Sequence, residues 1–100
     1  MIRHVCMFKL KEEAGGKSKT ENLHTAVTML KALYDLPGVV RAEVVTNSPL
    51  TPDSNYDLCL IFDFENVEDL NAYQAHPRHA EFGAFITPVR ESRACIDYEF

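Results

Sequence analysis

Two segments of the chain alternate in residue type and yet stay apolar on both faces, and this pattern constrains the fold more than any other. In residues 2–10, one face is formed by Ile2, His4, Cys6, Phe8 and Leu10. The middle of the opposite face carries Val5 and Met7. Residues 56–64 repeat the pattern, with a Leu/Phe row on one face and Ile61 on the other. A period of two predicts β-strands, and both faces of their sheet need cover.

The remaining elements follow from periodicity and from helix stop signals. Apolar residues at helical spacing predict a helix from a cap at Ser18 or Thr20 to about Leu36, where Pro37-Gly38 stops it. A valine-rich run predicts a strand over residues 39–46, and residues 92–99 predict the last strand. Between residues 66 and 88 we expect two short helices. Asn66 caps the first, Pro77 begins the second and Pro88 limits it. Residues 11–18 and 47–55 are expected to be loops.

These elements occur in the order β-α-β-β-α-β, the split βαβ arrangement of ferredoxin-like α+β domains. Right-handed crossovers place both helical segments, the second one broken at Pro77, on one face of a four-stranded antiparallel sheet. A length of 100 residues with 46% hydrophobic residues suits a single domain spanning residues 1–100.

The sheet face without helices is predicted to meet a second copy of the chain. Its expected residues are Val5 and Met7, Cys59 and Ile61, and either Val40, Ala42 and Val44 or, after a one-residue shift, their neighbours. Apolar patches of this kind are uncommon on monomers. Pairing two such faces contributes about 25 cal/mol per Å² of apolar surface buried. A two-fold homodimer, or dimeric α/β barrel, is the simplest closed solution.

Composition excludes several classes of partner. The net charge is −5 and the basic residues are scattered, which argues against binding nucleic acid or an anionic membrane. No apolar run is long enough for a signal peptide or a membrane span. Three cysteines without a secretion signal indicate free thiols in a reducing compartment. We therefore expect a cytoplasmic protein.

One group of side chains, His4, Tyr73, His76 and His79, suggests chemistry. Their spacing across Pro77 can place Tyr73, His76 and His79 on one side. A histidine at position 4, under the helices, needs a hydrogen-bond partner, which Tyr73 or His79 could supply. A neutral imidazole can take a proton from a carbon next to a carbonyl, and a phenol can donate to the oxyanion. His79, Tyr73 and His4 are thus the catalytic candidates. The candidate ligand-binding residues are His76, Phe8, Leu58 and Phe82. No cofactor and no metal are expected.

The same residues also have structural interpretations. His76 suits a cap of the helix that begins at Pro77, Tyr73 suits a core aromatic, and His4 with His79 suits a structural pair. The His-x-x-His spacing is compatible with a metal ion, but no cysteine or carboxylate shares that register. The mid-strand cysteines are expected to be small hydrophobes. Asp57 and Asp63 are interpreted as strand-end or edge charges.

Three separate stretches resemble the stress-responsive A/B barrel (Dabb) family of dimeric α+β barrels. They are RHVCMFKLK near the start, YDLCLIFDFENVEDLNAYQAHPRHAEF in the second half, and RACIDYEF at the end. The resemblance covers nearly the whole chain. It implies the ferredoxin-like fold and a homodimer. The family includes plant stress-induced proteins and the polyketide cyclase that forms olivetolic acid.

The resemblance to that cyclase also implies roles for individual residues. The His/Tyr pair that serves it as acid and base in an aldol condensation falls on His79 and Tyr73. Its first-strand histidine falls on His4 and the first histidine of its HPxH segment on His76. A pocket tyrosine and a pocket histidine of the cyclase fall on Ala26 and near Leu58, so the walls of the pocket differ.

Two functions remain open at this point. One is a homodimeric A/B barrel protein that binds a small apolar ligand between sheet and helices. The other is a cofactor-free lyase or cyclase acting on a polyketide-like or other carbonyl substrate. A haem-degrading monooxygenase, which shares the barrel, is disfavoured because many of these enzymes use a pocket tryptophan and this chain has none.

Overall fold

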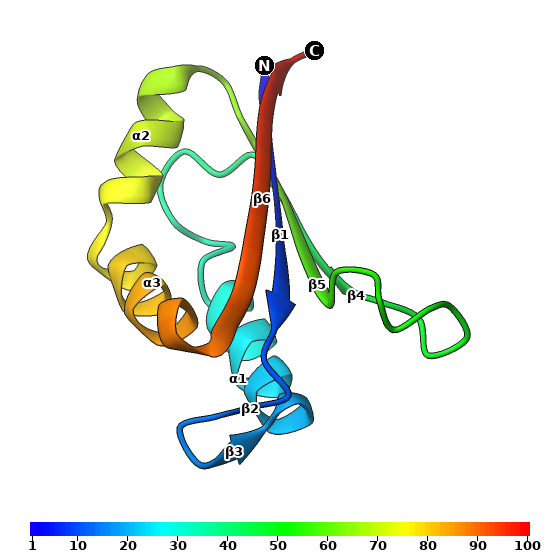
Figure 1. Ribbon diagram of the computed structural model, residues 1–100. Helices are drawn as coiled ribbons and strands as arrows, with labels where there is room; N and C mark the ends of the chain where they lie inside the picture. Colours follow the sequence, from blue (N-terminus) through cyan, green and yellow to red (C-terminus); the bar gives the residue numbers. More distant parts are fainter.

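One antiparallel sheet forms the frame of the molecule, and all three helices lie on the same side of it (Figure 1). The computed structural model describes residues 1–100. The sheet has the order β4-β5-β1-β6, with strands β1 (Ile2–Leu10), β4 (Arg41–Thr46), β5 (Leu58–Phe64) and β6 (Arg90–Glu99). Its helices are α1 (Lys19–Lys31), α2 (Val67–Ala75) and α3 (Pro77–Val89). The predicted ferredoxin-like α+β fold is confirmed. None of the helices has the length and apolarity to cross a membrane.

The register of the central strands sets the two faces of the sheet. On β1, every second residue from Ile2 to Leu10 is buried, and the residues between them are half-buried. His4 lies opposite Phe62 of β5, and Cys6 lies opposite Leu60. We call the face that carries these residues the covered face, because the helices pack on it and close the hydrophobic core. The other side, which carries Val5, is called the open face.

Strand β4 resolves the alternatives that the sequence left for the open face. Ala42 lies opposite Phe62 and Val44 opposite Leu60, so both belong to the covered face and pack against the core. Val45, opposite Cys59, occupies the open face instead and is 41% exposed. The second of the two registers is therefore correct for β4: Ala42 and Val44 face the core, and their neighbours in the strand face outward. Pairing with Phe62 decides the register because Phe62 is fully buried under the helices.

Helix α1 is shorter than predicted. Ser18 caps its N-terminus with the expected capping box, in which Glu21 and Ser18 exchange hydrogen bonds. It ends at Lys31 rather than near Leu36. Tight turns follow, in which the amides of Leu33 and Leu36 each bond the carbonyl three residues earlier. This geometry keeps both leucines in the core, so apolar residues continue at helical spacing beyond the last residue of the α-helix.

The first predicted loop contains a small hairpin, β2 (Glu13–Ala14) and β3 (Lys17–Ser18). Gly15 and Gly16 form its two-residue turn with φ angles of 62° and 77°, which non-glycine residues seldom adopt. Buried Asn22 of α1 fixes the hairpin by donating to the carbonyl oxygen of Ala14 at 3.2 Å. Two residues per strand are too few for an alternating pattern to show in the sequence.

The broken second helix is confirmed, with His76 at the junction. Asn66 caps α2 by accepting from the amide of Asp69 at 2.8 Å. His76 ends α2 and caps α3, since its Nδ1 accepts from the amide of Arg78 at 3.1 Å. Pro88 lies in the last turn of α3, one residue before its end. The other strand boundaries differ from prediction by two residues: β4 and β5 begin two later and β6 begins two earlier.

Candidate functional site

A cavity of about 110 Å³ lies between α3 and the covered face of the sheet. Strands β1, β5 and β6 form its floor and helix α3 forms its roof. Its apolar lining consists of Cys6, Phe8, Leu60, Phe82 and Ile86. The remaining lining residues are His4, His79, Gly83, Thr87, Arg90 and Arg93. Two histidines and two arginines thus share a small, otherwise apolar space.

His4 stands in the floor of this cavity and is held by a carboxylate. Its Nδ1 lies 2.5 Å from Oδ1 of Asp97, which is directly opposite on β6. A carboxylate only accepts, so Nδ1 of His4 donates this hydrogen bond to Asp97. We predicted Tyr73 or His79 as the partner of His4, and that prediction is wrong. The partner is Asp97 because the antiparallel register of β1 and β6 places the two side chains face to face.

Tyr73 connects His4 with His79. Its ring centroid is 6.3 Å from that of His4 and 4.8 Å from that of His79, in edge-to-face contacts. Phe62 and Phe64 pack against the other sides of the ring at 5.2 and 5.1 Å. The hydroxyl of Tyr73 is buried and has no hydrogen-bond partner. Tyr73 lies beside the cavity rather than in its lining, and a buried hydroxyl without a partner is uncommon in native proteins.

The environment shifts the two titratable groups in opposite directions. Burial lowers the pKa of His79 below its usual value, and the charges of His4 and Arg93 lower it further. Burial raises the pKa of Tyr73, so the phenol keeps its proton at neutral pH. The pair therefore consists of a neutral imidazole and a protonated phenol in contact. This is the combination that general acid–base chemistry requires.

Two cysteines lie beside His4 on the covered face. Cys95 is opposite Cys6 across the β1–β6 pair, and its Sγ is 3.6 Å from Nδ1 of His4. The donor atoms of His4, Cys6 and Cys95 lie within 4.8 Å of one another, a spacing that a soft metal ion can bridge. Burial, reinforced by Cys95, raises the pKa of Cys6 to about 12. This thiol stays protonated at neutral pH, which opposes metal binding.

The structure brings together some of the predicted site residues and separates others. His4 and His79 line the cavity together with Phe8 and Phe82, whose rings meet at 5.7 Å. His76 is a helix cap outside the cavity, as its structural interpretation proposed. Leu58 is buried in the core and does not line this cavity. It borders a different hollow instead.

Sequence reasoning missed three residues, namely Asp97, Arg90 and Arg93. All three belong to β6, which we described only as the last strand. Pairing the alternation of β6 with that of β1 would have placed Asp97 opposite His4. The two arginines share a face because of an irregularity in β6 that has no signal in the sequence pattern.

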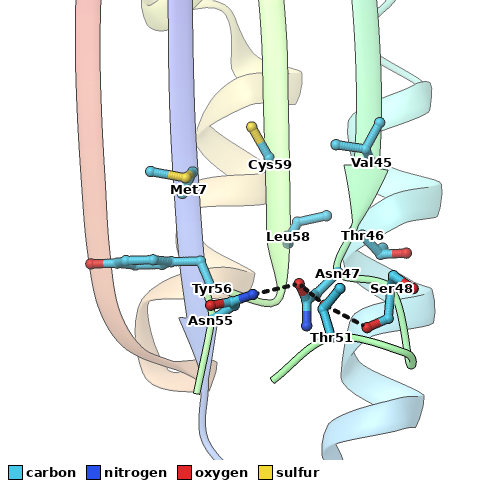
Figure 2. A pocket seen from close by; sticks show the side chains of 10 residues that line it. All are labelled: Met7, Val45, Thr46, Asn47, Ser48, Thr51, Asn55, Tyr56, Leu58 and Cys59. Atoms are coloured by element: carbon cyan, nitrogen blue, oxygen red, sulfur yellow. Dashed lines mark hydrogen bonds between the residues drawn. The ribbon is translucent and has the colours of Figure 1, made fainter. Parts of the chain in front are cut away.

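A second hollow, about 320 Å³ in volume, lies on the open face at the base of the loop between β4 and β5 (Figure 2). Met7, Cys59 and Val45 stand on three neighbouring strands at its upper end. Its polar rim is tied together by Asn47, whose side-chain oxygen accepts from Thr51 and Asn55. The lining holds no histidine and no charged residue. The smaller cavity under α3 is therefore the better candidate for chemistry.

Several solved structures share this fold. A dimeric ferredoxin-like protein of unknown function from Bacteroides fragilis is 28% identical, with a TM-score of 0.85 over 99% of this chain and 95% of that one. A Dabb family protein from Mesorhizobium loti is also 28% identical, with a TM-score of 0.71 and the same coverage of both chains. The hydroxynitrile lyase of Passiflora edulis shares the fold at 17% identity, with a TM-score of 0.76 over 97% of this chain and 90% of that one.

No curated protein matches the chain in sequence. The model of the stress responsive A/B barrel domain, by contrast, matches residues 2–100, almost the entire length. Together with the sheet order and the helices on one face, this match confirms the resemblance seen in the sequence. The chain belongs to the stress responsive A/B barrel (Dabb) family.

Proposed function

We propose that the cavity under α3 binds a small carbonyl compound and that His79 removes a proton from the carbon next to the carbonyl. The observation that carries this proposal is the contact between His79 and Tyr73 beside a cavity that His79 itself lines. An uncharged imidazole is a base, and its lowered pKa keeps it uncharged at neutral pH. A cofactor-free lyase or cyclase needs such a base.

Tyr73 and His4 complete the proposed machinery. The buried hydroxyl of Tyr73 has no partner in the protein, and it donates to the oxyanion when the substrate extends from the cavity past His79 to Tyr73. His4 acts as a positioning residue, because Asp97 fixes its ring against Tyr73. Substrate binding comes from the apolar walls, in particular Phe8 and Phe82.

Proton exchange tests the proposal without knowledge of the natural substrate. The α-protons of a small diketone such as 2,4-pentanedione are followed by NMR in heavy water, with and without the protein. We expect the wild type to accelerate exchange and His79→Gln to lower the acceleration by about 100-fold or more, the usual contribution of a general base. Tyr73→Phe should also lower it. His24→Gln, an exposed histidine on α1, is the matched control and should leave it unchanged.

Equal acceleration by the wild type and His79→Gln would contradict the enzymatic proposal. The second candidate function is then a binding protein that holds a small apolar ligand without turnover, which the five apolar lining residues support. In that case His4→Ala and His79→Ala change stability and ligand affinity alone. Crystals soaked with the diketone would show the ligand in the cavity near His79 under either function.

We also propose that the chain works as a homodimer paired through the open face. Ile96 is 61% exposed and Val45 41% exposed on this face, and the half-buried Val5, Met7 and Ile61 lie between them. Similar structures, including the one from Bacteroides fragilis, are described as dimeric. The three free thiols support the expected cytoplasmic location.

A further inference from the structure

Two arginines point into the cavity because β6 carries a β-bulge. Arg93 lies opposite Phe8 of β1 and Arg90 lies opposite Leu10, with a register shift between these two pairs. In a regular strand, residues three apart point to opposite faces. The extra residue at Glu91 returns Arg90 to the side of Arg93. Since Phe8 and Leu10 both belong to the covered face, both arginines reach the cavity that they line.

These two side chains differ from every other arginine of the chain. Arg3 forms an ion pair with Asp63, Arg41 with Glu43, and Arg78 with Asp35. Arg90, which is half-buried, and Arg93, which is exposed, form no ion pair with a carboxylate, and Arg93 lies close enough to Cys6 to act on the pKa of its thiol. The cavity lining contains no carboxylate. Asp97, on the same face of β6, is occupied by His4.

Arg90 is half-buried beside the apolar lining and has lost part of its hydration, and no carboxylate of the lining replaces it. Guanidinium groups bind planar carboxylates through two parallel hydrogen bonds, and charge-assisted bonds are stronger where water is excluded. The charge of Arg93 also acts on His79, whose pKa it helps to lower. An anion bound by the arginines would therefore lie within the same small space as the histidines.

We infer that the ligand of this cavity is a small carboxylate with an apolar body, whose anionic group is bound by Arg90 and Arg93. The apolar part of the ligand packs against Phe8, Phe82 and Ile86, which a free inorganic anion does not need. This inference rests on the proposed function and sharpens it, because it names the substrate class as carbonyl compounds that carry a carboxylate.

The experiment compares an acid with its neutral amide. Butyrate and butyramide have nearly the same shape, and neither carries a ketone, so their binding needs no catalysis. Affinities are measured by NMR titration of the ¹⁵N-labelled protein. We expect the wild type to bind butyrate about tenfold tighter than butyramide or more, as charge-assisted hydrogen bonds predict. The preference should disappear in the double variant Arg90→Gln/Arg93→Gln. Lys17→Gln, which removes one positive charge from the exposed β2–β3 hairpin outside the cavity lining, should retain it.

Three results would overturn the inference. They are equal affinity of the wild type for butyrate and butyramide, an undiminished preference in the folded double variant, and inorganic phosphate that competes as well as butyrate. The same spectra show whether the double variant is folded. The failure of the inference and of the proposed function are distinguishable. Exchange on a neutral diketone needs no arginine, whereas butyrate binding needs no base.

Discussion

The two faces of the sheet have similar apolar patterns but different polar residues, and the polar residues decide what each face can do. On the covered face, the histidine of β1 meets the carboxylate of Asp97 in the middle of an apolar surface. On the open face the charged pairs lie towards the ends of the strands and, as Arg41 and Glu43, on the edge strand β4. Arg3 holds Asp63 through two hydrogen bonds of 2.8 and 3.0 Å at one end, and Lys9 lies 3.8 Å from Asp57 at the other.

The positions of these charges are the basis for the different roles that we propose for the two faces. The hydrogen bonds from Arg3 lower the pKa of Asp63 and keep this pair ionised at neutral pH. The centre of the open face, formed by Val5, Ile61 and Ile96, is apolar and suits contact with a second flat sheet, with Glu43 opposite Ile61 on the edge strand β4. On the covered face the polar groups are central, so a ligand between sheet and helices meets them directly. An apolar centre flanked by charged pairs thus favours contact with a second subunit, whereas polar groups in the centre of a face favour acid–base chemistry on a bound ligand.

The largest expected effect comes from removing a ring of the covered face. Phe62 is fully buried and packs between Tyr34 and Tyr73 at 5.8 and 5.2 Å. Phe62→Ala should lower the free energy of unfolding by about 3–5 kcal/mol, because it leaves a cavity beneath two rings. Urea unfolding measures the loss. Val67→Ala, at a half-exposed position on α2, should stay within about 0.5 kcal/mol of the wild type. A loss in Phe62→Ala no larger than in this control would contradict the assignment of the faces.

A charge in the centre of the open face should separate the subunits. Val5 lies between Ile61 of β5 and Ile96 of β6. Val5→Asp would bury an unpaired carboxylate at the proposed interface, which is costly. Sedimentation should give the 11.4 kDa monomer for this variant and a dimer for the wild type. Leu50→Asp, at a 94% exposed loop position, is the control and should remain dimeric. A dimeric Val5→Asp would show that the subunits pair elsewhere.

The contrast between the faces was largely predictable from the sequence, because alternation in β1 and β5 is a local property. The face of β4 was not, since a valine-rich strand fits either register until it pairs with Phe62. The end of α1 was also missed, because 3₁₀-type turns and an α-helix bury the same leucines over one turn. The resemblance to a family added roles for the short-helix tyrosine and for the histidines of the His-Pro-x-His segment, which their spacing had already grouped.

The candidate site was only half predictable, and the reason is physical. His4, Tyr73 and His79 could be grouped because each lies in an element with a clear pattern. Asp97 belongs to the site through cross-strand pairing, which joins residues 93 positions apart. Arg90 belongs to it through a bulge, which breaks the alternation on which the reading of a strand depends. Long-range register and local irregularity are the two kinds of information that a single pattern does not contain.

The smallest expected effect concerns one proton on the covered face. The usual pKa of histidine is 6.5, and burial lowers that of His79 in the folded protein. Between these two pKa values the unfolded chain binds a proton at His79 that the folded chain does not. The free energy of unfolding should therefore fall as the pH falls below about 6.5, until the pKa of His79 in the folded state is reached.

His79→Gln isolates this contribution, because glutamine does not titrate in this range. Urea unfolding at one protein concentration, compared between about pH 7.5 and pH 5, should show a smaller loss of stability in His79→Gln than in the wild type. His24→Gln on the exposed surface of α1 should lose as much as the wild type, since it leaves His79 and its buried surroundings unchanged. If His79→Gln loses stability as steeply as the wild type, His79 is not kept neutral by burial. The covered face would then lack the base that distinguishes it from the open one.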